Sequence, residues 1–204
     1  MTLEQRAAAI PHMGARNIGK QLTDWASQCK SSIVECGSWL GSGTAYLAIG
    51  AARSGAKLHA FDNWKARDSE VEKAEKFGFA LASGQDTLPL VAKLLQPFGV
   101  DITFNQGPII DAMWSGEPIG LFVLDAAKRN PHFRHVAETF FPFLEDGAVV
   151  VLMDYHHYEI SGDKYRDQVR YMAKHPEFEK VEDRLGGETS AAVFIYRKTI
   201  SEGL

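Results

Sequence analysis

Short apolar runs alternate with helix-like stretches along this chain, and this alternation constrains the fold more than any other feature. The runs cover residues 32–36, 57–61, 101–105, 120–124 and 148–153. Strands that alternate with helices form a parallel sheet covered by crossover helices. The last two runs are apolar throughout, which is typical of strands buried on both faces. We therefore predict an α/β fold, a doubly wound sheet in which these five strands are parallel.

The C-terminal part is expected to close this sheet with an antiparallel hairpin. Residues 178–185 and 191–197 have the composition of strands, and the turn-forming pair Gly186-Gly187 lies between them. Upstream, residues 44–53 are predicted to form a helix, with Thr44 as its N-cap. The sheet is thus expected to be mostly parallel with an antiparallel end.

The composition limits the functions that a protein with such a sheet can have. A net charge of -4 argues against a nucleic-acid or anionic-membrane binder that works by bulk charge. Two cysteines are too few for a disulfide framework and indicate a reducing compartment. No apolar run approaches the roughly 18 residues of a membrane span, and the N-terminus lacks the apolar run of a secretory signal. We expect a cytoplasmic protein that binds neither nucleic acid nor membrane.

The length suits one domain, since domains take about 100–200 residues. We predict an N-terminal helical segment over residues 1–30 and a single domain over residues 31–204. Residues 63–84 are long, polar and dense in charge. A solvated helix face is one interpretation of this segment. A lid is the other, because the segment follows the carboxyl end of a strand, where ligands bind in such sheets.

The most specific local pattern joins the first strand to the first helix. It has the spacing E-x-G-x-x-x-G-x-x-T over residues 35–44. Glycines there let the backbone turn tightly, and the helix N-terminus presents free N–H groups to a ligand. The dinucleotide fingerprint G-x-G-x-x-G would need a glycine at position 39, where the chain has Trp39. The pattern therefore favours a neutral or zwitterionic adenosine ligand. Asp62, at the end of the second strand, is placed to accept hydrogen bonds from ribose hydroxyls, or else to cap the helix that follows.

These stretches together resemble a known family. VECGSWLGSGTAYLA, HAFDNW, LFVLDAAK and VVVLMDY, spread over roughly residues 30–200, are similar to the class I S-adenosylmethionine-dependent methyltransferases. The run at 125–130 resembles the caffeoyl-CoA branch of the small-molecule O-methyltransferases, and Asp62-Asn63-Trp64 resembles the macrocin branch. The resemblance implies a Rossmann-like methyltransferase sheet and S-adenosyl-L-methionine as cofactor. The cofactor-binding residues that it implies are Glu35, Gly37, Ser38, Gly41, Gly43, Thr44, Asp62, Asn63, Trp64, Gln106, Gly107 and Asp125.

A second group of residues is predicted to act on the acceptor. Asp125 and Asp154 each end a buried strand, and neighbouring strands lie about 4.8 Å apart, so the two acids could share a divalent cation such as Mg²⁺. The resemblance implies a third ligand directly after the second acid, where this chain has Tyr155, so Asn130, His156 or His157 would have to replace it. Without a metal, His156 or His157 is the expected general base. Lys128 resembles the family lysine whose charge favours the acceptor oxyanion.

The expected function is therefore O-methylation of a small hydroxylated metabolite, with metal assistance and a homodimer as further expectations. Two other functions stay open. A nicotinamide-dependent oxidoreductase would keep the fold but change the cofactor. A non-catalytic cofactor-binding protein would keep the fold and lose the chemistry.

Overall fold

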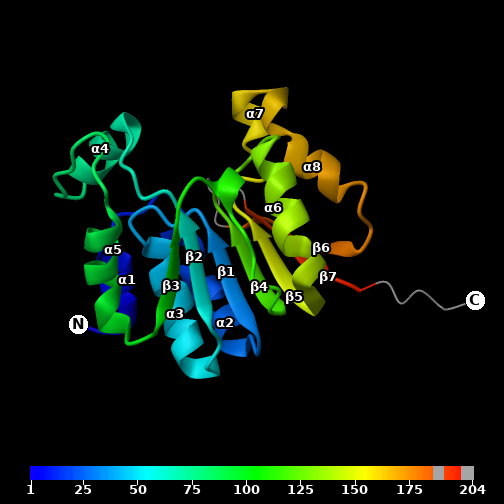
Figure 1. Cartoon of the computed structure of the whole chain (residues 1–204), viewed down its shortest axis with the longest axis horizontal. Helices are drawn as coiled ribbons and strands as arrows, with labels where there is room; N and C mark the ends of the chain where they lie inside the picture. The colour runs from blue at the N-terminus through cyan, green and yellow to red at the C-terminus, as the bar shows by residue number, and fades with distance from the viewer. Residues whose placement is uncertain (186–190, 199–204) are drawn as a thin grey trace, which may run out of the picture.

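The computed structural model describes residues 1–185 and 191–198, and in these residues it contains one seven-stranded sheet (Figure 1). The strand order is β3-β2-β1-β4-β5-β7-β6. The first five strands in this order pair in parallel, and β7 pairs antiparallel with both β5 and β6. The strands are β1 (Ser32–Cys36), β2 (Leu58–Asp62), β3 (Ile102–Gln106), β4 (Ile119–Leu124), β5 (Leu144–Leu152), β6 (Phe178–Leu185) and β7 (Ala191–Tyr196).

Helices cover both faces of this sheet, as the predicted doubly wound fold requires. The α-helices are α1 (Leu3–Ala9), α2 (Gly19–Gln28), α3 (Ser42–Ser54), α4 (Asp68–Glu75), α5 (Leu88–Leu95), α6 (His132–Phe140), α7 (Tyr158–Ser161) and α8 (Asp167–Met172). Short 3₁₀ helices occupy Ala15–Ile18, Gln96–Phe98, Ile109–Asp111, Phe141–Phe143 and Asp163–Tyr165. The predicted Rossmann-like fold is confirmed.

The sheet separates two apolar cores because successive side chains of a strand point to opposite faces. In β1, Ile33 packs into the core shared with α1, α2, α3 and α5. Val34 and Cys36 pack into the opposite core with α6 and α8. Every residue of β1 is buried, so this strand lies at the centre of the molecule. Packing on both faces therefore holds the carboxyl end of β1 in place, and the loop that follows starts from a fixed position.

The helix after β1 begins earlier than expected. α3 starts at Ser42 and its N-cap is Gly41, in a left-handed conformation with φ 88°. Thr44 is therefore not the N-cap; it lies inside the first turn of α3, where its hydroxyl donates to Glu35. The predicted end of this helix is confirmed, since Gly55 adopts φ 75° as its C-cap. The predicted turn at Gly186-Gly187 lies outside the described residues.

The charged segment 63–84 contains α4 and stands above the carboxyl edge of the sheet, opposite α7 (Figure 1). Most of its side chains face solvent, but Glu70 and Ala74 are buried. Glu70 accepts hydrogen bonds from the backbone N–H and the guanidinium of Arg67, which fixes the start of α4. The segment is thus largely exposed to solvent and stands above the edge at which ligands bind in such sheets.

The structure also shows the state of the two cysteines and the character of the helices. Cys29 and Cys36 are free and buried, as the low cysteine count suggested. None of the helices in the described ranges combines the length and the apolar character needed to cross a membrane.

Candidate active site

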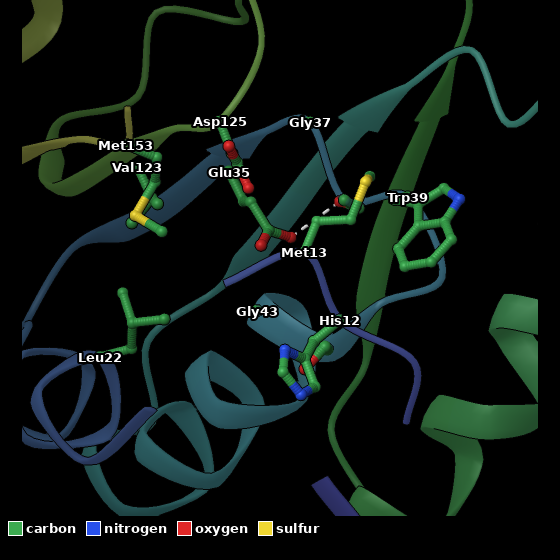
Figure 2. Close-up of a pocket in the computed structure, with 12 residues that line it drawn as sticks. His12, Met13, Leu22, Glu35, Gly37, Trp39, Gly43, Val123, Asp125 and Met153 are labelled. Carbon is green, nitrogen blue, oxygen red and sulfur yellow. Dashed lines mark hydrogen bonds between the residues drawn. The ribbon is translucent and has the colours of Figure 1, made fainter. Parts of the chain in front are cut away.

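A cleft of about 660 Å³ opens at the carboxyl edge of the sheet. Residues that follow β1, β2, β4 and β5 line it, and Arg67, Glu70 and Lys73 close one side. The chain crosses over between β1 and β4, and ligands bind at such switch points in doubly wound sheets. A smaller pocket continues inward from the cleft toward Glu35 and Ser42 (Figure 2).

The loop after β1, residues 37–41, lies where the cleft and the inner pocket meet, and we call it the glycine loop. Gly37 has φ 100° and lines both. A Cβ atom at this position would lie 2.8 Å from the backbone carbonyl carbon of Asp125. Only glycine therefore lets the loops after β1 and β4 approach so closely. Gly43 lies in the first turn of α3 and lines the inner pocket, as does Ser38.

Glu35 is the buried acid of the inner pocket. Its carboxylate accepts hydrogen bonds from the hydroxyl of Ser38, at 2.7 Å, and from that of Thr44. Burial raises the pKa of Glu35 to about 7, against the opposing effect of these two hydroxyls. The Ser42 hydroxyl oxygen lines the same pocket and is buried without a hydrogen-bond partner among the described residues.

Asp62 ends β2 and faces the cleft. Its two carboxylate oxygens accept hydrogen bonds from the backbone N–H groups of Trp39 and Trp64, each at 2.9 Å. Burial raises the pKa of Asp62, and the two N–H donors act in the opposite direction. These bonds hold the carboxylate in one orientation and tie the loops after β1 and β2 together. Asn63 also lines the cleft, and its side chain accepts from the Lys65 N–H.

Trp64 does not line the cleft, contrary to its predicted place beside a cofactor. Its side chain is 1% exposed and packs edge-on against Phe104 in the core, with ring centroids 5.6 Å apart. A left-handed backbone at Trp64, φ 45°, turns the ring inward. Trp39 is the tryptophan that lines both the cleft and the inner pocket.

Gln106 and Gly107, which the resemblance implies as cofactor-binding residues, do not line the cleft. The Gln106 amide donates to Asp86, at 3.0 Å, and lies outside the cleft lining. Gly107 donates its N–H to the backbone oxygen of Asp62, at 3.0 Å, and thereby supports that acid from below. Pro108 and Ile109 are the residues of this loop that line the cleft.

Asp125, Lys128 and Asp154 form a charged cluster in the cleft, and Asp125 also lines the inner pocket with Glu35. The Lys128 Nζ lies 2.9 Å from the Asp154 carboxylate and 4.0 Å from that of Asp125. Burial raises the pKa of Asp125 to about 7, with a further upward effect from Asp154 and a downward one from Lys128. The two predicted acids are therefore adjacent, and an ammonium group lies beside both.

Two of the three predicted third ligands, Asn130 and His156, do not join this cluster. The Asn130 side chain accepts from the Arg134 N–H of α6, at 3.1 Å, outside the cleft lining. His156 is buried, and its ring nitrogens contact Glu159 at 3.1 Å and Asp183 at 2.7 Å. His156 is thus held by two acids and lies outside the cleft lining. Within the described part of the chain, no three His, Cys, Asp or Glu side chains gather as a metal site would require.

His157 is the histidine that lines the cleft. Its ring packs edge-on against Tyr165, with centroids 4.8 Å apart. Tyr165, Arg129 and His132 share this part of the lining, and none of the three was predicted. His132 begins α6, Arg129 precedes that helix and Tyr165 ends a 3₁₀ helix, so only the tertiary fold brings the three to one edge.

The N-terminal segment also reaches the site, which the sequence did not indicate. His12 and Met13 line the inner pocket opposite Glu35 and Trp39 (Figure 2). Met13 also lines the cleft, where its sulfur lies 3.0 Å from the Lys73 Nζ of α4. His12 packs edge-on against Phe77, with centroids 5.4 Å apart. The segment between α1 and α2 thus meets the α4 segment above the glycine loop.

A family comparison identifies a fold and site of this kind. A family model described as a methyltransferase domain matches residues 34–155, from β1 through the end of β5. The chain belongs to the class I S-adenosylmethionine-dependent methyltransferases. The matched range contains the glycine loop, Asp62 and the Asp125 cluster of this methyltransferase. The alternative of a nicotinamide-dependent oxidoreductase is thereby set aside. The comparison with curated proteins gave no significant match.

Solved structures share the fold of this methyltransferase at low sequence identity. The O-methyltransferase NovP aligns with a TM-score of 0.66 and 11% identity, over 90% of this chain and 81% of that one. CalS11, a TDP-rhamnose 3'-O-methyltransferase of calicheamicin biosynthesis, gives 0.64 and 14%, over 88% and 78%. The methyltransferase PaMTH1 of Podospora anserina, solved with S-adenosylhomocysteine, gives 0.56 and 12%, over 91% and 80%. These likenesses concern the fold.

Proposed function

We propose that this methyltransferase transfers the methyl group of S-adenosylmethionine to an oxygen of a small hydroxylated metabolite. One observation carries the proposal: the cleft contains Asp62, Lys128 and His157, and it shares Gly37, Trp39 and Asp125 with the inner pocket that holds Glu35. Its volume of about 660 Å³ is in the usual range for small-molecule sites, roughly 300–1,000 Å³. The O-methyltransferase activities of NovP and CalS11 support an oxygen acceptor.

The residues around Glu35 and Asp62 fit the cofactor. The polar methionine portion needs hydrogen-bonding groups in a tight pocket, and the pocket offers the Glu35 carboxylate and the Ser42 hydroxyl, which has no partner among the described residues. Gly37 allows a ligand to approach the backbone because no side chain covers it. Asp62 presents a carboxylate that two N–H groups hold in place, and carboxylate oxygens retain further lone pairs for ribose hydroxyls.

When bound, S-adenosylmethionine supplies an electrophilic methyl group, and its transfer forms one C–O bond while the S–C bond breaks with its electron pair left on sulfur. The protein contributes position and charge. Holding the acceptor oxygen in line, at roughly 3–3.5 Å from the methyl carbon, accounts for much of the rate in such displacements. Met13, Trp39 and Arg67 also line the cleft in which the two substrates would meet.

His157 and Lys128 act on the acceptor. His157 lines the cleft beside Asp154, and a histidine ring nitrogen is the group that most often accepts a proton in general base catalysis. Lys128 carries a fixed positive charge 2.9 Å from Asp154, where it favours the oxyanion that forms as the proton leaves. Asp154 orients the lysine side chain, which leaves the remaining ammonium protons to the substrate.

Calorimetric titration of S-adenosylhomocysteine tests the cofactor assignment. We expect micromolar binding to the native protein and at least tenfold weaker binding to Asp62→Ala, because the ribose loses its acceptor. Asn105→Ala, on the neighbouring strand and outside the cleft lining, is the matched control and should bind like the native protein. Absence of binding to the native protein would overturn the proposal.

Methyl transfer to a panel of catechols, sugars and polyketides then tests the acceptor assignment. We expect His157→Gln to lower the turnover number by about 10²-fold with cofactor affinity unchanged, as loss of a general base does. Cofactor binding together with methylation only of nitrogen or carbon would contradict the oxygen assignment. Binding with no transfer to any acceptor would favour the non-catalytic alternative.

A further inference from the structure

We propose, resting on the proposed function, that the Lys128 ammonium occupies the position of a divalent cation in this site, and that the methyltransferase works without a metal. The proposal concerns the part of the cleft assigned to the acceptor. It rests on the position of Lys128, on the donor groups around Asp125 and Asp154, and on the chemistry that an ammonium group can supply there.

Lys128 lies where a shared cation would lie. Its Nζ is within 4.0 Å of a carboxylate oxygen of Asp125 and of Asp154. All three side chains are partly shielded, with 21%, 28% and 33% of their areas exposed in the order Lys128, Asp125 and Asp154. Two carboxylates at this depth repel each other, and the nearby ammonium reduces that repulsion. Lys128 is therefore a partly buried member of the cluster and not a freely exposed surface side chain.

The remaining donors do not complete a metal shell. Tyr155, which follows the second acid, is 6% exposed and packs against Phe194 in the core, with centroids 5.5 Å apart. Asn130 is engaged by the backbone of α6, and His156 is held between Glu159 and Asp183. Mg²⁺ binds proteins through one or two carboxylates with waters completing its shell, so a site here would depend on these two carboxylates alone, and an ammonium group already neutralises them in part.

An ammonium can perform the electrostatic task that the metal was expected to perform. The acceptor O–H bond breaks, its proton passes to the His157 imidazole, and the electron pair stays on oxygen until it bonds to the methyl carbon. Lys128 donates a hydrogen bond to that oxygen and stabilises its negative charge. Asp154 has φ 53°, and its backbone oxygen accepts the N–H of His157 at 2.8 Å, so one tight turn sets both residues at the same point.

Binding of Mn²⁺, followed by electron paramagnetic resonance of the free ion, tests the proposal on the protein alone. We expect no specific site in the native protein below millimolar concentration. In Lys128→Met the two acids lose their cation, so Mn²⁺ should bind at least about tenfold more tightly than to the native protein. The double variant K128M/D154N should lose this gain. Lys93→Met, an exposed lysine on α5 outside the cleft, should resemble the native protein.

Two results would overturn the proposal. One is a micromolar Mn²⁺ site in the native protein that Asp154→Asn removes; this measurement needs no lysine variant and so does not depend on how the lysine variants fold. The other is a folded Lys128→Met that gains no affinity, because the lysine would then not stand in for a cation.

An activity measurement separates this proposal from the proposed function. Excess chelator should leave methyl transfer by the native protein unchanged, while Lys128→Met should lower the turnover number by at least about 10²-fold and retain S-adenosylhomocysteine binding. Loss of activity with chelator and rescue by Mg²⁺ would overturn the metal-free mechanism and leave the methyltransferase assignment intact. Failure of cofactor binding would instead count against the proposed function.

Discussion

At the scale of single residues, Gly37 is the position on which the site depends most directly. It has φ 100°, and a Cβ atom added there would lie only 2.8 Å from the Asp125 backbone. Gly37→Ala must therefore push the loops after β1 and β4 apart. We expect it to lower the free energy of unfolding by about 2–4 kcal/mol, as strained or overpacked substitutions do. S-adenosylhomocysteine affinity should fall at least tenfold.

Gly99→Ala separates strain from steric contact in this prediction. Gly99 also has a positive φ, 67°, but a Cβ there meets no atom within 4 Å. Its substitution should cost about 1 kcal/mol through backbone strain alone and leave cofactor affinity unchanged. Urea denaturation and calorimetry measure both quantities. Equal losses in the two variants would show that the close approach to Asp125 does not matter.

Residue roles are predictable from sequence where the backbone pattern fixes them. Glu35, Gly37 and Asp62 are expected in the site because a glycine loop and a strand end place them there, and they do line the cleft or its inner pocket. Trp64 and His156 lie outside these linings because the direction of a side chain depends on its tertiary neighbours, which the sequence pattern does not specify.

At the scale of elements, the bounds of the strands are predictable within a few residues because a buried parallel strand appears in the sequence as an apolar run. β5 is the exception: it starts at Leu144, four residues before its apolar run, since Glu145, Asp146 and Gly147 are polar or lack a side chain. The antiparallel pair of β6 and β7 agrees with the sequence pattern, but that pattern does not indicate the insertion of β7 between β5 and β6. Strand order arises from packing over the whole sheet, which local composition does not encode.

The contact between the N-terminal segment and α4 yields a prediction at this scale. Met13 lines both pockets and reaches Lys73, yet its side chain is exposed to 38%. Met13→Ala should therefore weaken S-adenosylhomocysteine binding about three- to tenfold while changing the free energy of unfolding by less than about 0.5 kcal/mol. Met113→Ala alters the same residue type at 84% exposure, outside the cleft, and should change neither quantity.

Hydrogen exchange gives an independent measure of the same contact. If the two segments cover a bound ligand, S-adenosylhomocysteine should slow amide exchange in residues 12–18 and 68–79 together. The Met13→Ala variant should show less of this protection. Protection confined to the glycine loop would contradict a covering role for either segment.

At the scale of the whole molecule, a parallel sheet concentrates acids at one edge. Glu35, Asp62, Asp125 and Asp154 come from four different strands or strand ends, and all lie around one cleft because parallel strands terminate together. Two of these acids, Glu35 and Asp125, have a pKa raised to about 7 by burial. Ionisation of these two buried groups therefore lowers the free energy of unfolding.

The pH dependence of unfolding follows from this cost, and Glu35→Gln isolates one part of it. The folded pKa of Glu35 is about 7 and its ordinary value is 4.5, so the folded state binds more protons between these pH values. Stability must then fall as pH rises through this window and level off above it.

Glutamine resembles the protonated acid, so at pH 5 the Glu35→Gln variant should match the native protein. At pH 8 it should be more stable, by at most about 3 kcal/mol, from 1.36 kcal/mol for each unit of pKa. Urea denaturation at the two pH values measures the difference, with the exposed Glu72→Gln as control. A gain of equal size at both pH values would show that the benefit comes from packing and not from removal of a buried charge.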